Sequence, residues 1–311
     1  MTVSTAPRPS RTSGPSGASG TSRLSQATPE YLRRNLILIR IGLYLALVML
    51  IVASLAPMLW VLSTSFKSTA EIFGGGVNWV PVEPTLENYQ RAFTEYPLGS
   101  WMWNSVVIAF WTILITCVLH IMAAYALAKL QFRFKPLLIV IILATIMIPR
   151  ELAAIPSYQF IRDANLLDSQ TAVIVPQIAE AITVFLLYQF FAAIPDEFVE
   201  AARLDGASHW RILWTIFVPL SRPAIAVVII LAFVNSWNNF FWPLLVTFTT
   251  ASVPLPVGLA SIMASYAESS AARQYGLLMA ISLIASLPTI VIFLILQRRF
   301  VEAVTSTGIK G

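Results

Sequence analysis

Long hydrophobic stretches separated by short polar ones run through most of the chain. A hydrocarbon core about 30 Å thick needs roughly 20 consecutive apolar residues in a helix that crosses it. Six stretches meet that length, and we predict a membrane-spanning helix for each: Leu36–Leu62, Trp103–Ala128, Leu137–Phe160, Ala172–Ala193, Ala224–Val246 and Tyr275–Leu296. The pattern therefore predicts an all-α, polytopic membrane protein with six transmembrane helices.

The third stretch is interrupted by polar residues. Its unbroken apolar run ends at Ile148 and is followed by Pro149, Arg150 and Glu151. As a helix the run measures about 18 Å, which is too short to cross a bilayer. Either the helix continues with a kink through the charged pair, or it reaches the surface early. Interrupted helices are typical of transport paths, and we place Arg150 and Glu151 at the outer mouth of such a path.

Composition excludes a soluble globule. Hydrophobic residues make up 57% of the chain and charged residues only 11%, against about a quarter charged in soluble domains. The single cysteine, Cys117, excludes an intrachain disulfide. The net charge of +5 is compatible with a nucleic-acid partner, but the positions of the positive residues favour another interpretation.

Positive residues mark one side of the membrane. With the amino terminus inside, 15 of the 20 Lys and Arg residues fall on the inner side of the six predicted spans. The positive-inside rule then places both termini in the cytoplasm, and no nucleic-acid partner is expected. Ser, Thr, Gly and Pro fill 19 of the first 30 residues. We therefore predict a disordered cytoplasmic tail over 1–30, followed by a transmembrane domain over 31–311.

Sequence signatures of enzymes and metal sites are missing. The chain has no G-x-x-x-x-G-K-[ST] phosphate loop, no H-E-x-x-H and no G-x-S-x-G. Its two histidines, His120 and His209, have no neighbours at metal-ligand spacing. We predict that this chain is not an enzyme and binds no metal or cofactor. His120, within the second span, is interpreted as a packed, hydrogen-bonded imidazole.

The longest inner loop, residues 195–223, has the pattern of two short helices. Pro195 and Asp196 suit a helix start, Gly206 a helix end, and Ser208 the cap of a second helix. One side of the first helix carries small residues, an aromatic and an acid: Phe198, Ala201, Ala202 and Asp205. Such a helix either lies in a partner's groove or is an ordinary amphipathic connector.

Polar side chains recur in the fifth predicted span. Asn235, Asn238, Asn239 and Trp242 are spaced i, i+3, i+4 and i+7, which places them on one face of a continuous helix. Uncharged amides beside an aromatic plane suit a sugar, so we predict that they line the substrate pathway. The alternative is that the asparagines only join helices.

Glu180 is the one acid deep inside a predicted span, the ninth of 22 residues in Ala172–Ala193. A carboxylate at that depth costs about 2.5–3.5 kcal/mol on insertion scales. It should therefore face a cavity or a partner group. Glu180 is either a hydrogen-bond acceptor in the substrate pathway or a member of a structural ion pair.

The inner loop also resembles a known motif. Glu200-Ala201-Ala202, then Gly206, then Ile216-x-Val218-Pro219 resembles the EAA loop of permease subunits of binding-protein-dependent ABC importers, although Val218 stands where leucine is usual. Other segments resemble the carbohydrate-uptake class and its maltose-type second permease: Pro84–Tyr89, Asn104-Ser105, Ala123–Ala126, Arg203–Ala207, Trp237-Asn238, Gln297–Val301 and Gly308–Gly311.

The resemblance implies a type I ABC importer permease fold in a bacterial or archaeal cell membrane. It implies a heterodimer with a second permease subunit, two separate ATPase subunits that hold ATP and Mg, and an extracytoplasmic solute-binding protein. The loop residues Glu200 and Gly206 would dock the ATPases, and we add Ala201, Ala202 and Asp205 because we expect them to face the same way. Thr307–Gly311 would reach into the ATPase dimer.

The sequence thus predicts a permease subunit for uptake of a mono- or oligosaccharide. A close alternative is a glycerol-3-phosphate or glycerophosphodiester importer, in which a phosphate would need a cation. Arg150 is the only candidate cation embedded in a span. A stand-alone channel or proton-coupled transporter would need no ATPase, and a membrane enzyme would need a clustered site that the sequence lacks. In the family, the partner permease can hold most substrate contacts.

Overall fold

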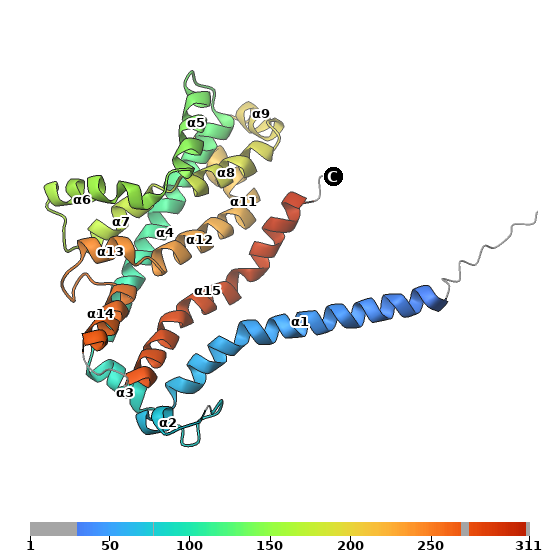
Figure 1. Ribbon diagram of the computed structural model, residues 1–311. Helices are drawn as coiled ribbons and strands as arrows, with labels where there is room; N and C mark the ends of the chain where they lie inside the picture. The colour runs from blue at the N-terminus through green and yellow to red at the C-terminus, as the bar shows by residue number, and fades with distance from the viewer. Residues whose placement is uncertain (1–29, 77, 269–273, 309–311) are drawn as a thin grey trace, which may run out of the picture. The chain divides into compact units, whose positions relative to one another are not determined.

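The computed structural model describes residues 30–76, 78–268 and 274–308, and these residues form helices and connecting turns with no β-strand (Figure 1). The chain divides into two compact units, residues 1–56 and 57–311. The described part of the first unit is the beginning of α1 (Glu30–Ser65). The predicted tail lies outside the described residues except for Glu30, and so do the last three residues of Thr307–Gly311.

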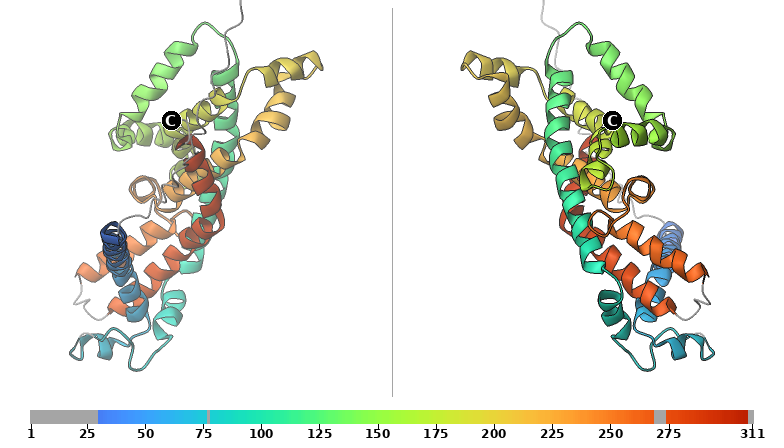
Figure 2. Two further views of the ribbon diagram at one scale, coloured as in Figure 1. Left: turned by 90° about the vertical axis from the view of Figure 1, so that its right-hand side faces the viewer. Right: turned by 90° about the vertical axis from the view of Figure 1, so that its left-hand side faces the viewer.

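The second unit is built around α4 (Leu98–Lys129), which packs against α7 (Gln170–Ile178), α8 (Ala181–Ala193) and α12 (Arg222–Trp237). One stripe of α4 is buried at intervals of three or four residues and contains small or hydroxyl side chains on most turns: Asn104, Ser105, Ile108, Ala109, Thr112, Thr116, His120 and Ala124. Small side chains let neighbouring helices approach closely in a membrane. Figure 2 shows α4 running through the length of this unit.

Membrane-spanning capacity is confirmed for the described helices, but three of the predicted spans are broken. Leu38–Ser65, Leu98–Lys129 and Tyr275–Gln297 are each long and apolar enough to cross a membrane, the last within α15 (Tyr275–Gly308). Three further pairs of helices qualify only when each bent pair is counted as one span. By length and composition the described residues therefore provide three to six spans.

The third predicted span turns sharply. Helix α5 (Lys135–Ile146) ends early, and the 3-10 turn η1 (Arg150–Ala153) leads into α6 (Ala154–Asp163) after a bend of 99°. Pro149 favours an extended conformation for the residue before it, which explains the end of α5. The alternative of one helix that continues with a kink through Arg150 and Glu151 is therefore wrong, because α5 ends and the chain changes direction before them.

The fourth predicted span bends by 43° between α7 and α8, and Glu180 lies in the break. Pro176 inside α7 has no N–H to donate to the carbonyl of Ala172. The indole N–H of Trp242 donates to that carbonyl instead, at 2.9 Å. A side chain from another segment thus satisfies a backbone group that the proline leaves without its helical partner.

The fifth predicted span, Ala224–Val246, is wrong as a continuous helix. Helix α12 ends at Trp237, and α13 (Phe241–Val246) begins after a short break. The bent pair that qualifies as a span joins His209–Leu220 to Arg222–Trp237 at 84°. An unpredicted apolar helix, α14 (Leu255–Glu268), packs on α4. Gly258 permits this contact, because the Trp101 ring occupies the space of any side chain there.

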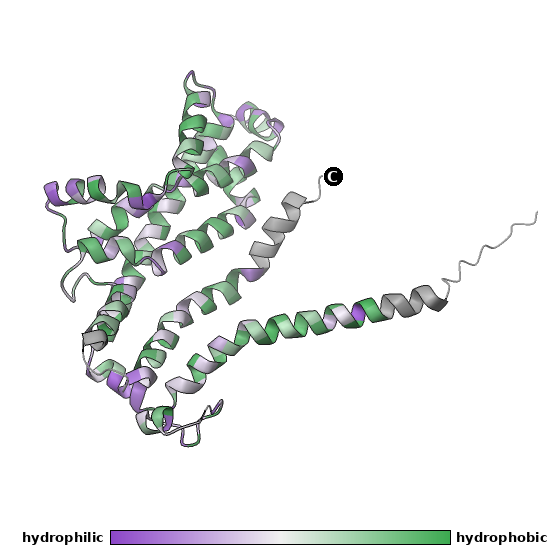
Figure 3. Cartoon of the chain, in the orientation of Figure 1, coloured by the Kyte–Doolittle hydropathy of each residue, from purple (hydrophilic) through white to green (hydrophobic). Residues whose placement is uncertain are grey.

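Two polar ends bracket the second unit. At one end, α2 (Thr69–Phe73) and α3 (Glu87–Thr94) lie in the connection before α4, and at the other end α9 (Glu197–Leu204) follows α8 (Figure 1). Figure 3 shows hydrophilic residues gathered at α3 and α9, with hydrophobic helices between them. This distribution is the one expected of a membrane protein with two wet faces.

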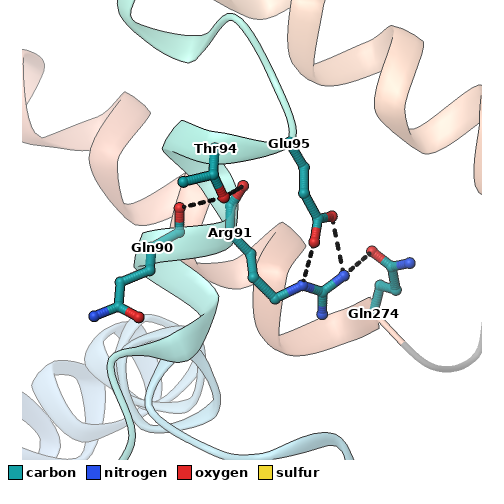
Figure 4. Close-up of polar contacts among 5 residues, drawn as sticks. All are labelled: Gln90, Arg91, Thr94, Glu95 and Gln274. Carbon is teal, nitrogen blue, oxygen red and sulfur yellow. Dashed lines mark hydrogen bonds and ion pairs between the residues drawn. The ribbon is translucent and has the colours of Figure 1, made fainter.

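Polar contacts tie the connection before α4 to the start of α15. In α3, the Arg91 Nε lies 2.6 Å from Glu95 Oε1, and Arg91 also donates to Gln274 Oε1 at 3.2 Å (Figure 4). The hydrogen bond from Arg91 lowers the pKa of Glu95, slight burial opposes it, and the arginine's charge adds to the lowering. The carboxylate is therefore held in its charged form beside the arginine.

Candidate functional site

The first half of the inner loop forms a short helix with a glycine stop. Helix α9 begins after Asp196 and ends at Leu204, with Asp205 as its C-cap, and Gly206 follows with a φ of +77°. The N–H of Gly206 donates to the carbonyl of Arg203 at 3.0 Å, and that of Ala207 to Ala202 at 2.9 Å. This is the Schellman arrangement, which requires a left-handed residue at the position of Gly206. The predicted start and stop are confirmed.

The second half of the loop begins at a serine cap, also as predicted. The Ser208 hydroxyl accepts a hydrogen bond from the N–H of Arg211 at 3.3 Å, which starts α10 (His209–Ile212). A π-helical turn (Leu213–Phe217) and α11 (Val218–Leu220) continue the path to α12. The loop is thus a helical hairpin whose corner is Gly206.

Helix α4 holds this hairpin through two side chains that sequence reasoning missed. The Lys129 Nζ donates to the carbonyl of Ile194 at 2.5 Å and lies 2.6 Å from the Asp196 carboxylate. The Tyr125 hydroxyl lies 3.0 Å from His209 Nδ1. Phe217 is fully buried beneath them, against Tyr125. The end of α4 therefore positions both arms of the hairpin. The sequence signal for this role is only that Tyr125 and Lys129, one helical turn apart, are polar.

The predicted docking residues divide between two sides of α9. Glu200, Ala201, Asp205 and Gly206 are exposed, but Ala202 is half-buried against the core beside the buried Val199. That turn of α9 packs on its own chain, so Ala202 is less open than its neighbours, and its part in docking stays a prediction. Leu204, which was not among the predicted docking residues, is 90% exposed. The open surface of the hairpin therefore combines acids, an alanine and a large apolar side chain.

A second polar group forms where the broken helices meet. The Glu180 carboxylate is 6% exposed, and its Oε1 lies 2.9 Å from an Arg150 guanidinium nitrogen. The side-chain amide of Asn235 donates to the same oxygen at 2.6 Å. Arg150, Glu180 and Asn235, the charged cluster, thus come from three bent helix pairs. Arg150 was predicted at an outer mouth, and the structure pairs it with Glu180.

Histidine 120 stabilises the break that presents Glu180. Its Nε2 lies 2.8 Å from the carbonyl of Ile178, and its Nδ1 lies 2.6 Å from the hydroxyl of Thr183. Because a carbonyl only accepts, Nε2 carries the proton and donates. The Thr183 hydroxyl also lies 2.9 Å from the carbonyl of Glu180. The interpretation of His120 as a packed, hydrogen-bonded imidazole is confirmed.

The other predicted pathway residues do not share one helical face. Asn238 ends α12, Asn239 lies in the break, and Trp242 belongs to α13. That prediction is wrong because the helix stops at Trp237. Asn238 is exposed and Asn239 half-buried, whereas Trp242 is buried and donates to Ala172. Glu151 is exposed on the turn that carries Arg150.

Asp168, in the connection before α7, organises the loop after α13. Its Oδ1 accepts from the N–H groups of Phe248 and Thr249 at 2.7 and 2.9 Å, and from the Ser252 hydroxyl. Burial alone would raise the pKa of Asp168, but the hydrogen bonds from Ser252, Phe248 and Thr249 outweigh it and lower the pKa to about 2. The charged carboxylate is thus a fixed anchor for residues 248–252.

Among the described residues, no group of three His, Cys, Asp or Glu side chains is placed to hold a metal ion. The helices and their breaks define a polytopic α-helical membrane protein with a polar hairpin at residues 195–223 and a charged cluster at its bends. Comparison with known proteins agrees with that class. Residues 105–306 match the family model described as "Binding-protein-dependent transport system inner membrane component".

Curated relatives cover nearly the whole chain. The arabinooligosaccharides transport system permease protein AraQ of Bacillus subtilis (strain 168) is 33% identical over 276 residues, 88% of this chain and 96% of that protein. The sn-glycerol-3-phosphate transport system permease protein UgpE of Yersinia pestis bv. Antiqua (strain Antiqua) is 31% identical over 277 residues, 87% and 95% of the two chains.

A solved structure shares the fold. It is the crystal structure of a bacterial ABC transporter involved in the import of the acidic polysaccharide alginate, matched with a TM-score of 0.76 at 24% identity over 86% of this chain and 98% of that one. The chain therefore belongs to the family of inner-membrane components of binding-protein-dependent transport systems, and it is a permease subunit of an ABC importer.

Proposed function

We propose that this permease subunit imports a sugar, either a monosaccharide or an oligosaccharide, into the cytoplasm. The observation that carries the proposal is the likeness to an arabinooligosaccharide permease over 88% of the chain. The charged cluster supports it, because Arg150 is already paired with Glu180 and is not free to neutralise a phosphate. Import of glycerol-3-phosphate or a glycerophosphodiester is the second candidate, favoured by the likeness to a glycerol-3-phosphate permease.

Energy for transport would enter through the hairpin 195–223. The chain itself binds no cofactor in this proposal; two ATPase subunits hold ATP and Mg and dock on the exposed face that includes Glu200, Ala201, Asp205 and Gly206. Leu204, 90% exposed, supplies an apolar contact on that face. Because Lys129 and Tyr125 fix the hairpin to α4, movement of the docked ATPases is passed to a helix that runs through the whole unit.

The remaining subunits follow from the family. A second, different permease completes the membrane pathway, and an extracytoplasmic solute-binding protein delivers the sugar. Both termini lie in the cytoplasm, on the side of the hairpin. Asn235, Asn238, Asn239 and Glu180 line this chain's share of the pathway, with Arg150 and Glu151 toward its outer side. Trp242 stays a prediction as a pathway residue, since its indole N–H is engaged by the backbone of Ala172.

Transport in a defined system tests the proposal. The complex, reconstituted in proteoliposomes with ATP on the ATPase side, is given its binding protein and labelled arabino-oligosaccharide, maltose or sn-glycerol-3-phosphate. ATP-dependent uptake of a saccharide supports the sugar assignment. Uptake of glycerol-3-phosphate alone moves the assignment to the second candidate. Uptake that continues without ATPase subunits contradicts the importer mechanism.

A further inference from the structure

The charged cluster consists of one buried acid and two partners that are more exposed than the acid. Glu180 is 6% exposed, while the Arg150 side chain is 55% exposed and Asn235 is exposed. Arg150 and Glu180 each lie at the break of a bent helix pair, and Asn235 lies near the end of a third. Irregular backbone at membrane depth is tolerated where it lines a cavity or is buried in protein. A cluster accessible on one side at such breaks is a place where a solute can reach polar groups.

The hydrogen-bonding capacity of the cluster suits uncharged hydroxyl groups. A guanidinium has five N–H donors in a planar fork, and an amide both donates and accepts. The Glu180 Oε1 receives one contact from Arg150 and one from Asn235, so the fork retains further donors. A carboxylate and a guanidinium in contact carry no net charge between them. Hydroxyl groups gain hydrogen bonds there, whereas an anion meets the negative charge of Glu180 beside the arginine.

We propose that Arg150, Glu180 and Asn235 form a charge-neutral subsite for hydroxyl-rich, uncharged solutes, in which Glu180 shields Arg150 from anions. The inference rests on the proposed function, because it assigns the solute class within that pathway. Glu180 is then a specificity-determining residue: it prevents Arg150 from retaining a phosphate or carboxylate. Removal of its charge is expected to convert the cluster into an anion site.

A gain of anion binding tests this role directly. The full chain is purified in detergent with the subunits that remain bound, and its apparent melting temperature is followed with inorganic phosphate against chloride of equal ionic strength. For Glu180→Gln, saturating phosphate should raise the melting temperature by about 2–4 °C or more. The wild-type chain should show no such difference between the two salts.

Two matched variants identify the source of the effect. Adding Arg150→Gln to Glu180→Gln should abolish the phosphate shift, because the exposed cation is gone. Asp163→Asn frees a similarly exposed arginine, Arg162, whose side chain is 56% exposed, from an exposed ion pair. It should give no shift, since Arg162 lies at the end of α6 and outside the cluster that the Asn235 amide completes, and an exposed arginine by itself binds phosphate weakly. If Glu180→Gln does not assemble, Glu180→Asp, which shortens the side chain, should give a smaller shift of the same sign.

A wild-type chain that responds to phosphate as strongly as the variant would overturn the proposal. So would the absence of a shift in both Glu180 variants, or an equal shift in Asp163→Asn. The salt response does not depend on any transported sugar. If Glu180→Gln responds to phosphate but the complex imports no saccharide, the proposed function is refuted and the shielding role stands. If the complex imports a sugar but Glu180→Gln does not respond to phosphate, the shielding role is refuted and the proposed function stands.

Discussion

The hairpin 195–223 and the charged cluster are built in opposite ways. In the hairpin, each structural signal acts within a few residues: Ser208 caps the helix that follows it, and Gly206 ends the one before. In the cluster, 30 residues separate Arg150 from Glu180 and 55 separate Glu180 from Asn235. A local motif can therefore be read from sequence, while a site assembled from helix breaks depends on the tertiary fold.

The two regions also differ in exposure, which decides what a substitution changes. The open face of the hairpin includes Leu204 at 90% exposure, so changes there affect the docking of partners. The cluster contains a carboxylate at 6% exposure, so changes there also affect stability and solute choice. The predictions below separate these effects, beginning with the largest.

The strongest expected effect on the docking of partners is at the corner of the hairpin. Gly206 has a φ of +77°, with open space where a side chain would lie. A β-branched residue is strained at such an angle by about 1–2 kcal/mol. Where the free hairpin relaxes to relieve this strain and the docked hairpin must keep the present shape, docking weakens by about 5- to 30-fold. Gly206→Val should therefore lose ATPase binding by that factor in titrations of the purified permease complex.

The matched control is Gly206→Asn, which adopts the left-handed conformation more readily. It should retain most of the binding, and membrane insertion should be normal for both variants. Equal binding by the valine and wild-type chains would show that the corner conformation is unimportant for docking.

The next effect is at the break that holds Glu180. His120→Leu leaves the carbonyl of Ile178 without its donor, and buried unsatisfied groups cost about 1–3 kcal/mol. We expect a lower apparent melting temperature for the purified complex. His120→Gln, which can still donate, should lose less; identical losses for leucine and glutamine would exclude the hydrogen bond as the cause.

At the base of the hairpin, the two members of one ion pair should behave unequally. Lys129 is 4% exposed at its side chain and Asp196 is 76% exposed. Lys129→Met removes the donor to the Ile194 carbonyl and should destabilise the complex by about 1–3 kcal/mol, measured by thermal unfolding. Asp196→Asn removes an exposed charge and should cost about 1 kcal/mol or less. A reversed order would mean that the carboxylate, and not the carbonyl, is the important partner.

The smallest effect is expected at the loop after α13. The pKa of Asp168 is lowered from 3.8 to about 2, so its stabilising contribution is complete above about pH 4 and is lost as the pH falls through about 2. Hydrogen exchange of the Phe248 and Thr249 amides should therefore show no transition from this carboxylate between pH 5 and 8. Asp168→Ala should accelerate that exchange by about tenfold or less; unchanged exchange would contradict the anchoring role.

The sequence predicted structure correctly where the signal for an element lies within the element itself or next to it. The apolar stretches predicted the membrane helices, and Pro195, Gly206 and Ser208 predicted the hairpin. It failed at Ala224–Val246, which is long and largely apolar and contains no proline or glycine before Pro243 to mark the break at Asn238. Tertiary contacts decide that break: Trp242 must leave the line of α12 to reach the carbonyl that Pro176 leaves free.

The candidate site was predicted in part. Glu180 was selected because an acid in an apolar stretch needs a cavity or a partner, Asn235 because amides suit a sugar, and Arg150 because it interrupts an apolar stretch. Their contact with one another was not predicted, since it depends on a 99° bend that Pro149 marks but whose direction the sequence does not specify. Lys129 and Tyr125 were missed for the same reason, as their partners lie 65 and 84 residues away.

Coupling through the inner hairpin is the central claim, and purification from the native membrane tests it most directly. The tagged wild-type and Gly206→Val chains are isolated in mild detergent, and the bound proteins are identified and quantified by mass. We predict that both chains retain a second permease subunit, and that the wild-type chain alone retains a full complement of ATPase. Recovery of the wild-type chain without any ATPase, or equal ATPase on both chains, would contradict the account.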